Sequence, residues 1–285
     1  MNRKLYFITL NWHTTRLLKD MVASVEATTP QPHQWIIVDN GSDRENWSEL
    51  KHWAQEHDLN NGSRGYLHRY MTNRGLIVAH NRALDLAALG AQAYDVVLIN
   101  TDVIVHEEGW LGRVWTWADE RPEVGMIGLE HNRVNVCASA IFLDQQGYWY
   151  VHEEQPTRAE PVEGESVGFG MVLLRWPVLE AGLRFDLAYQ MYYKQDDDLA
   201  FQIRAYLGLE VWGFPIGCEH WGCGSIKTNG PPGGHEAFER IKCRNQAVFA
   251  ERWAWALRPR RATMEAEQEH LQEMKMAMAR RRGDA

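Results

Sequence analysis

Residues 94–105, YDVVLINTDVIV, decide how the rest of the chain can fold. The apolar run 96–99 stops at Asn100, Thr101 and Asp102, and three β-branched residues then follow. A short run of this kind predicts an interior strand of a parallel sheet, buried on both faces. Ligands of such sheets bind at the carboxyl ends of the strands, which makes Asp102 a candidate site residue. The alternative is an ordinary strand end with an Asx turn.

Length and charge limit the possible class of protein. A chain of 285 residues can bury the core of one large α/β domain. Its formal net charge of -8 gives no overall attraction for nucleic acid, which does not exclude a local basic patch. No apolar run approaches the roughly 20 residues that span a bilayer, and residues 1–12 do not form a signal peptide. We therefore expect a soluble, cytoplasmic protein without a transmembrane segment, with peripheral membrane association left open.

The cysteines predict neither disulfides nor zinc. Four of them, Cys137, Cys218, Cys223 and Cys243, are too few and too scattered for a disulfide framework. Cys218, His220 and Cys223 lie close together in GCEHWGC, so a zinc site has to be considered. Their spacing matches no usual zinc pairing, and no second cluster supplies further ligands. We expect free thiols.

Strands and helices alternate along the first part of the chain. The apolar patterns predict strands at residues 5–10, 35–38 and 66–70, and helices at residues 16–27, 45–57 and about 77–89. This alternation is typical of βαβ units with right-handed crossovers. Neither GxGxxG nor GxxxxGK[ST] follows these strands, which disfavours a dinucleotide-binding domain and a P-loop.

The second part of the chain is less regular. We predict helices at residues 109–121, 195–206 and 235–257, strands at 126–129 and 209–214, and paired strands at 138–143 and 148–151. A charged helix or tail occupies residues 258–285. Polar residues now follow four separated strands: Asp39, Asn73 with Asn81, Asp102, and the cluster Asp196, Asp197 and Asp198.

Six motifs appear in a recognisable order. They are ITLNW with IIVDNGSD (8–12 and 36–43), NRGLIVAHN (73–81), VLINTDV (97–103), VGFGMVLLRWPVLEAGLRFD (167–186), MYYKQDDDLAFQIRAYLG (191–208) and FPIGCEHWGCGS (214–225). Together they resemble the family 2 glycosyltransferases of the GT-A fold, in particular the rhamnosyltransferase-like branch. The resemblance covers residues 5–253, most of the chain.

The resemblance implies a fold, a domain division and an activity. The fold would be a Rossmann-like mixed sheet with helices on both faces. Residues 1–257 would form one glycosyltransferase domain, with a nucleotide-sugar half at about 1–105 and an acceptor half at about 106–257. The reaction would be inverting transfer from a UDP-, dTDP- or GDP-linked sugar to the hydroxyl group of a glycan, lipid-linked or other acceptor.

The resemblance also implies which residues form the site. The donor would be bound by Asn11, Asp39, Asn73, Gly75, Asn81, Asn100 and Thr101. The acceptor side would hold Gly168, Phe169, Gly170 and Asp198. Mn2+ or Mg2+ would be bound by Asp102 and His220, which suits hard and borderline cations. The general base would be Asp196, with Asp197 as the alternative.

Departures from the family pattern keep other interpretations open. Lys194 looks inserted before the acidic cluster, Gln195 takes the place of the usual Glu, and His80 takes the place of the usual Arg. Replaced acids could mean a non-catalytic sugar- or nucleotide-binding relative. The arginines near residue 260 leave open an acceptor on modified nucleic acid. A sugar nucleotidyltransferase is disfavoured, because TLNWHTTRLL lacks the glycine-rich phosphate loop that such an enzyme needs.

Overall fold

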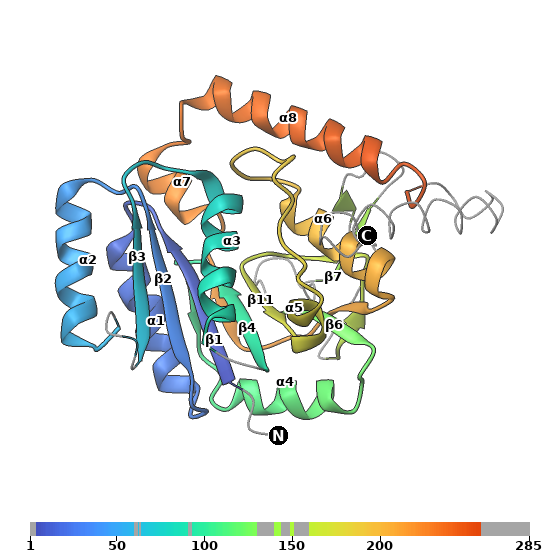
Figure 1. Ribbon diagram of the computed structural model, residues 1–285, viewed down its shortest axis with the longest axis horizontal. Helices are drawn as coiled ribbons and strands as arrows, with labels where there is room; N and C mark the ends of the chain where they lie inside the picture. The colour runs from blue at the N-terminus through green and yellow to red at the C-terminus, as the bar shows by residue number, and fades with distance from the viewer. Residues whose placement is uncertain are drawn as a thin grey trace.

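A computed structural model describes residues 4–59, 62, 64–90, 93–129, 140–143, 149–150 and 160–257. Its main feature is an eight-stranded sheet in the order β3-β2-β1-β4-β11-β6-β12-β9. Figure 1 shows helices on both sides of this sheet, with α8 lying across the top of the view. The predicted charged helix or tail at 258–285 lies outside the described residues.

The first half of the sheet follows the predicted alternation closely. Its strands are β1 (Lys4–Asn11), β2 (Gln34–Asn40), β3 (Gly65–Tyr70) and β4 (Tyr94–Ile99), and its helices are α1 (Thr15–Thr28), α2 (Arg44–Glu56) and α3 (Gly75–Ala88). β1 pairs in parallel with both β2 and β4. The chain therefore builds outward to β3 and then returns to the other side of β1, so the connections diverge between β1 and β4.

Strand β4 is interior, as its apolar run predicts, but its surroundings are only half parallel. All six of its residues are buried. Its side chains alternate between two hydrophobic clusters, with Val96 and Leu98 in one and Val97 and Ile99 in the other. On one edge it pairs with β1, and on the other it pairs antiparallel with β11 (Met171–Leu174). The expectation of a parallel sheet around β4 was wrong on that side. β11 begins with Met171 beside Ile99, at the carboxyl end of β4, and runs along β4 in the opposite direction.

The second half holds shorter elements. The predicted strands and helices appear as β6 (Val124–Gly128), β12 (Glu210–Gly213), α4 (Trp110–Asp119), α6 (Gln195–Gln202) and α8 (His235–Arg252). β7 (Ala140–Leu143) and β8 (Trp149–Tyr150) form the expected antiparallel pair. A π-helical turn, Ile203–Leu207, extends α6. Helix α8 ends five residues earlier than predicted.

Several short elements were not predicted from the sequence. They are β5 (Val103–Val105), separated from β4 by a turn, together with β9 (Val162–Glu163), β10 (Ser166–Val167), β13 (Cys218–His220), α5 (Trp176–Glu180) and α7 (Gly224–Asn229). β13 pairs antiparallel with β5 and sets His220 opposite Val103. This pairing brings two motifs that are more than 100 residues apart to one end of the sheet.

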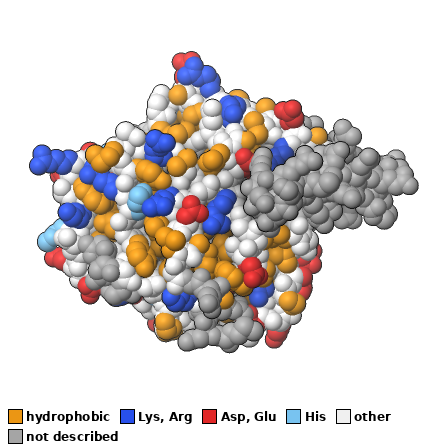
Figure 2. All heavy atoms as spheres, viewed as in Figure 1, with side chains coloured by type: hydrophobic (Ala, Val, Ile, Leu, Met, Phe, Trp, Pro, Cys, Tyr) orange, Lys and Arg blue, Asp and Glu red, His pale blue; other side chains and the backbone are white. Residues whose placement is uncertain are grey.

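The described part of one face of the molecule carries charges of both signs (Figure 2). Figure 2 shows Lys and Arg side chains scattered among hydrophobic and acidic ones over the described part of the face viewed in Figure 1. None of the helices in the described ranges combines the length and apolar content that crossing a bilayer requires.

One carboxylate joins α1 to the sheet. Oε1 of Glu26 accepts hydrogen bonds from Trp35 Nε1 at 2.9 Å and lies 3.2 Å from His33 Nε2, and Oε2 lies 2.7 Å from Arg64 Nη2. Burial raises the pKa of Glu26, but the hydrogen bonds from His33 and Trp35 outweigh burial and lower it to about 2. The ionised form of Glu26 therefore stabilises the folded chain.

Replacing Glu26 by Gln should make stability less dependent on pH. A depressed pKa means that the stabilisation is complete above the ordinary value of 4.5 and is lost as pH falls towards about 2. Allowing for the partial exposure of the group, Glu26→Gln should lower the free energy of unfolding by roughly 1–2 kcal/mol at pH 7. In urea unfolding between pH 7 and pH 3, the difference in the free energy of unfolding between Glu26→Gln and the wild type should become smaller below about pH 4.5.

Glu49→Gln is the matched control, because Glu49 pairs with Lys19 at 2.6 Å on the surface. A surface ion pair contributes little to stability, so the free energy of unfolding of Glu49→Gln should stay close to that of the wild type from pH 7 to pH 3. A gap for Glu26→Gln that stays constant down to pH 3 would show that its charge does not stabilise the fold.

Candidate active site

A cavity of about 490 Å³ opens at the carboxyl ends of β1 and β4. This is the point where the connections of the sheet diverge, which is where open α/β sheets bind ligands. Of the residues predicted from the sequence, the cavity is lined by Asn73, Gly75, Asn100, Thr101, Asp102, Gly168, Phe169, Gly170, Asp196 and His220. Five predicted residues do not line it: Asn11, Asp39, Asn81, Asp197 and Asp198.

Asp102 and His220 lie side by side in the cavity wall. Nε2 of His220 is 3.3 Å from Oδ1 of Asp102. The backbone N–H of Gly224 donates to Oδ2 of Asp102 at 2.7 Å. A Cβ at position 224 would lie 2.7 Å from Cβ of Asp102, so only glycine allows this approach. Burial raises the pKa of Asp102, but His220 and the Gly224 N–H outweigh it, so the net shift is downward and the group is ionised at neutral pH.

This pair fits a divalent cation. Carboxylate oxygen and imidazole nitrogen together suit Mn2+, and the carboxylate also suits Mg2+. Neighbouring ligands of an octahedral ion at about 2.1 Å lie about 3 Å apart, close to the separation of Oδ1 and Nε2. Within the described residues, no third His, Cys, Asp or Glu joins them to make a metal cluster. Most coordination positions would therefore be left for oxygen atoms of a ligand and for water.

The residues next to Asp102 are fixed by the neighbouring strands. The backbone N–H of Asn100 donates to the carbonyl of Gly170 at 2.8 Å, which ties the end of β4 to the loop that begins β11. Oγ1 of Thr101 donates to Oγ1 of Thr14 at 3.2 Å. Phe169 lies in the same loop, against His80. These contacts hold the backbone of the turn after β4, while the side chain of Asn100 faces the cavity.

Asp196 is a second acid in the cavity wall, separate from Asp102. It lies in the first turn of α6 and is 6% exposed. Its Oδ1 and the Oε1 of Gln195 are buried without a hydrogen-bond partner among the described residues. Burial, and then the charge of Asp197, raise the pKa of Asp196 to about 7. The site therefore holds a carboxyl group that exchanges its proton near neutral pH.

Asp197 and Asp198 point away from the cavity. Asp197 accepts a hydrogen bond from Lys194 Nζ at 2.8 Å. Asp198 accepts hydrogen bonds from Tyr189, Gln202, Trp253 and Arg252, and so joins α6 to α8. The side chains of Asp196, Asp197 and Asp198 thus lie in three different environments.

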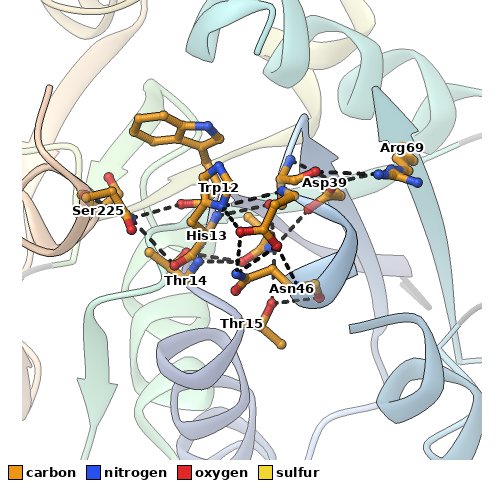
Figure 3. A network of polar contacts seen from close by, with 12 residues as sticks. Trp12, His13, Thr14, Thr15, Asp39, Asn46, Arg69 and Ser225 are labelled. Carbon is orange, nitrogen blue, oxygen red and sulfur yellow. Dashed lines mark hydrogen bonds and ion pairs between the residues drawn. The ribbon is translucent and has the colours of Figure 1, made fainter. Parts of the chain in front are cut away.

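Asp39 and Asn11 organise the turn after β2 from behind the cavity. Asp39 is fully buried and accepts from Asn11 Nδ2 at 2.9 Å and from the backbone N–H of Ser42 at 3.2 Å. Figure 3 shows Asp39 between Arg69 on one side and Thr14 and Thr15 on the other. The nearest Arg69 nitrogen is 3.7 Å from Oδ2 of Asp39. In this structure both residues fix the loops rather than line the cavity.

The segment before α3 also divides into lining and supporting residues. Oδ1 of Asn73 accepts from Asn40 Nδ2 at 3.1 Å and from the Gly75 N–H at 2.9 Å. Gly75 has φ 82°, and a Cβ there would lie 2.7 Å from Cα of Met191. Asn81 donates to and accepts from the backbone of Phe185, so it holds α3 to the loop that follows α5.

His80, which the resemblance sets where an arginine is expected, is buried. It contacts Phe169 and Phe185 and lines the cavity. Burial lowers its pKa to about 4. At neutral pH the residue is therefore an uncharged imidazole, and it does not supply the positive charge that an arginine would give.

The most important supporting residue missed by the sequence reasoning is Asn245 on α8. Its Oδ1 accepts from the Gln190 N–H at 3.0 Å, and its Nδ2 donates to the carbonyls of Gln190, Tyr192 and Tyr193 at 2.8, 2.6 and 3.2 Å. Two residues of this loop, Met191 and Tyr193, have positive φ. An asparagine in a helix gives no sequence signal for such a role, because its partners lie more than 50 residues away.

Asn245→Ala should destabilise the protein by roughly 2–3 kcal/mol, because it removes a buried side chain that satisfies four backbone groups. Urea unfolding monitored by tryptophan fluorescence measures this change. Asn229→Ala is the control, since Asn229 is exposed and its contacts with the backbone of Trp12 and His13 are 3.5 Å long. Equal losses in the two variants would show that the Asn245 contacts carry no special stabilisation.

Comparison with known proteins supports the fold. No family model and no curated protein matches the chain. The crystal structure of GalNAc-T7 with UDP, GalNAc and Mn2+ is similar, with a TM-score of 0.63 and 14% identity over 88% of this chain and 48% of that one. This chain thus spans about half the length of that protein. Mannosyltransferase PcManGT from Pyrobaculum calidifontis, in complex with GDP-Man and Mn2+, has a TM-score of 0.55 and 15% identity over 96% of this chain and 80% of that one. The mixed α/β sheet with its flanking helices is that of the GT-A glycosyltransferase structures.

Proposed function

We propose that the protein is an inverting glycosyltransferase that moves a sugar from a nucleotide diphosphate sugar to an acceptor hydroxyl group. One observation carries the proposal: a single cavity is lined both by the Asp102–His220 pair and by a separate, largely buried carboxylate, Asp196, whose Oδ1 has no hydrogen-bond partner among the described residues. The fold shared with the two glycosyltransferase structures supports it. Assignment to family 2 and to its rhamnosyltransferase-like branch belongs to the same proposal.

The donor would bind along the ends of β1, β4 and α3. Asp102 and His220 would hold Mn2+ or Mg2+, which neutralises the charge that develops on a departing diphosphate. Asn100 and Thr101 would contact the sugar or ribose, and Asn73 and Gly75 would lie beneath the diphosphate. Asn11, Asp39 and Asn81 would act by fixing these loops. A UDP-, dTDP- or GDP-linked sugar meets this description equally well.

The acceptor would bind on the side of α6, beside Gly168, Phe169 and Gly170. Asp196 would accept the proton of the attacking hydroxyl group as its oxygen bonds to the anomeric carbon, on the face opposite the departing diphosphate. A single displacement of this kind inverts the anomeric configuration. Asp196 is favoured over Asp197 because it alone of the two lines the cavity, while Asp197 pairs with Lys194. The acceptor is a hydroxyl group of a glycan, a lipid-linked sugar or another molecule.

Asp196→Asn should lower kcat by ~10²–10⁴-fold, the usual contribution of a general base, and leave the KM for the donor nearly unchanged. In the wild type the rate should fall as pH drops below about 7, because the base must be ionised. The assay is nucleotide release from a panel of UDP-, dTDP- and GDP-sugars, with the product anomer assigned by NMR. A wild type that binds a donor with metal yet never transfers its sugar across a broad acceptor panel would be a binding protein instead.

The two polar residues after β4 should respond differently to substitution. Asp102→Ala should abolish metal-dependent transfer and the Mn2+-dependent rise in melting temperature with nucleotide, because it removes a charged metal ligand. Asn100→Ala should only weaken transfer, since its amide is proposed to orient the donor. Thermal shift with and without Mn2+ and initial rates measure both effects. Equal losses in the two variants would contradict this division of roles.

A further inference from the structure

The inserted lysine before the acidic cluster is one of the most completely buried side chains of the protein. Lys194 is 1% exposed. Its Nζ donates to Oδ2 of Asp197, which is fully buried, at 2.8 Å. The ammonium group also lies 5.1 Å from the ring centre of Phe249 and 5.6 Å from that of Tyr193. Taking these two charges out of water is costly unless each compensates the other. The pair is therefore a fixed part of the interior.

The backbone around Lys194 is held in an uncommon conformation. Lys194 has φ 69° and stands at the N-cap of α6, and Tyr193 and Met191 also have positive φ. Such conformations are uncommon for residues with a Cβ and persist only where the surrounding structure maintains them. The side chain of Asn245 holds the loop before α6 in place by donating to the backbone carbonyls of that loop. A surrounding structure that maintains strain next to a site is a sign of function rather than of chance.

The geometry of α6 separates its three acids. Consecutive residues of an α-helix are about 100° apart around the axis. Asp196 faces the cavity, Asp197 faces Lys194, and Asp198 faces Tyr189 and Trp253. The helix geometry thus lets Asp197 pair with Lys194 while Asp196, its immediate neighbour, faces the cavity.

We propose that the buried Lys194–Asp197 ion pair is a fixed electrostatic support for Asp196, with Lys194 the positioning residue that holds Asp197 away from the cavity. The pair keeps one carboxylate of the cluster facing the acceptor side and sets the charge behind it. This inference rests on the proposed role of Asp196 as general base and explains why a lysine is tolerated inside the acidic motif.

Among the charged groups, the two members of this pair have the largest effect on Asp196. Burial and the Asp197 carboxylate raise the pKa of Asp196, whereas the Lys194 ammonium lowers it. The other charged groups that face α6 are engaged elsewhere: Arg252 of α8 pairs with Asp198 and with Asp186. Also on α8, Lys242 lies over the Tyr193 ring at 5.6 Å and pairs with Glu239.

The test is the titration of Asp196 in ligand-free protein, followed by NMR of ¹³C-labelled aspartate. The Asp196 signal is assigned by its loss in Asp196→Asn. In Asp197→Asn the pKa of Asp196 should fall by about one pH unit or more, because a like charge is lost while the cation stays. In the double variant Lys194→Met/Asp197→Asn, the pKa of Asp196 should lie between its value in Asp197→Asn and its value in the wild type. Asp186→Asn is the control and should leave Asp196 unchanged.

The double variant also keeps the test valid if the single variant Asp197→Asn does not fold. It replaces both charges, which proteins tolerate better than the loss of one partner. Circular dichroism and thermal unfolding establish that each variant is folded. An Asp196 titration that is the same in the wild type, the single variant and the double variant would overturn the proposal, and so would a lower pKa in the double variant than in Asp197→Asn.

Kinetics separate this inference from the proposed function. Asp197→Asn should keep most of kcat at high pH, and the pH at which its rate falls should move down with the Asp196 titration. A purely structural pair would lower kcat without moving that pH, which would contradict the proposal. A folded Asp197→Asn that is as inactive as Asp196→Asn would make Asp197 the base and overturn it. A wild type without any transfer refutes the proposed function, and the NMR titration still decides whether the pair supports Asp196.

Discussion

The pairing of β4 with β1 on one edge and β11 on the other is the constraint on which the site depends. It makes β4 an interior strand whose two faces lie in the two hydrophobic clusters, and the chain becomes polar at Asn100, where the strand leaves the sheet. The polar turn that results, Asn100 to Asp102, lies against the end of β1 and the glycine loop before β11. Each of these neighbours supplies a wall of the cavity. The position of the site is thus a consequence of how one apolar strand is covered.

A second principle is the division of similar residues among different tasks. Asp102 is stabilised as an anion by a histidine and a backbone N–H, whereas Asp196 is pushed toward neutrality by burial and by Asp197. Two carboxyl groups in one cavity therefore carry different protonation states at the same pH. This difference in environment, and not in residue type, is the basis of the two roles proposed above, metal binding for Asp102 and proton exchange for Asp196.

Much of the fold could be predicted from the sequence, because the apolar patterns of the first half are local and strong. The strands and helices up to β4 lie within two residues of their predicted limits. The antiparallel pairing of β7 with β8 also agrees with the paired strands predicted at 138–143 and 148–151. The predictions failed where tertiary contacts decide: β5 and β13 are three residues each and exist because they pair with one another. Strand β11 runs against β4, which no pattern within β4 could show.

The site was partly predictable for the same reason. Asn100, Asp102 and Asp196 follow or begin regular elements, so their type and place give a signal. Whether a polar residue lines the cavity or supports it depends on the direction of its side chain, and the side chains of Asp39 and Asn81 turned out to bond to neighbouring loops. Asp197 was an open alternative that the sequence could not resolve, since its partner Lys194 looked like an irregularity. Asn245 gave no signal at all.

Helix α8 has a consequence for the dynamics of the site. Of its 18 residues only Asn245, Gln246 and Phe249 are buried, so few of its side chains pack into the core, and polar contacts such as the ion pairs of Arg252 supply much of its attachment. Yet Asn245 is what keeps residues 190–193 in their left-handed turns, and Phe249 covers Lys194. Proteins open in cooperative units whose free energies differ widely, and weakly anchored helices are among the first to open. We therefore expect hydrogen exchange at the start of α6 to follow the opening of α8 rather than that of the sheet.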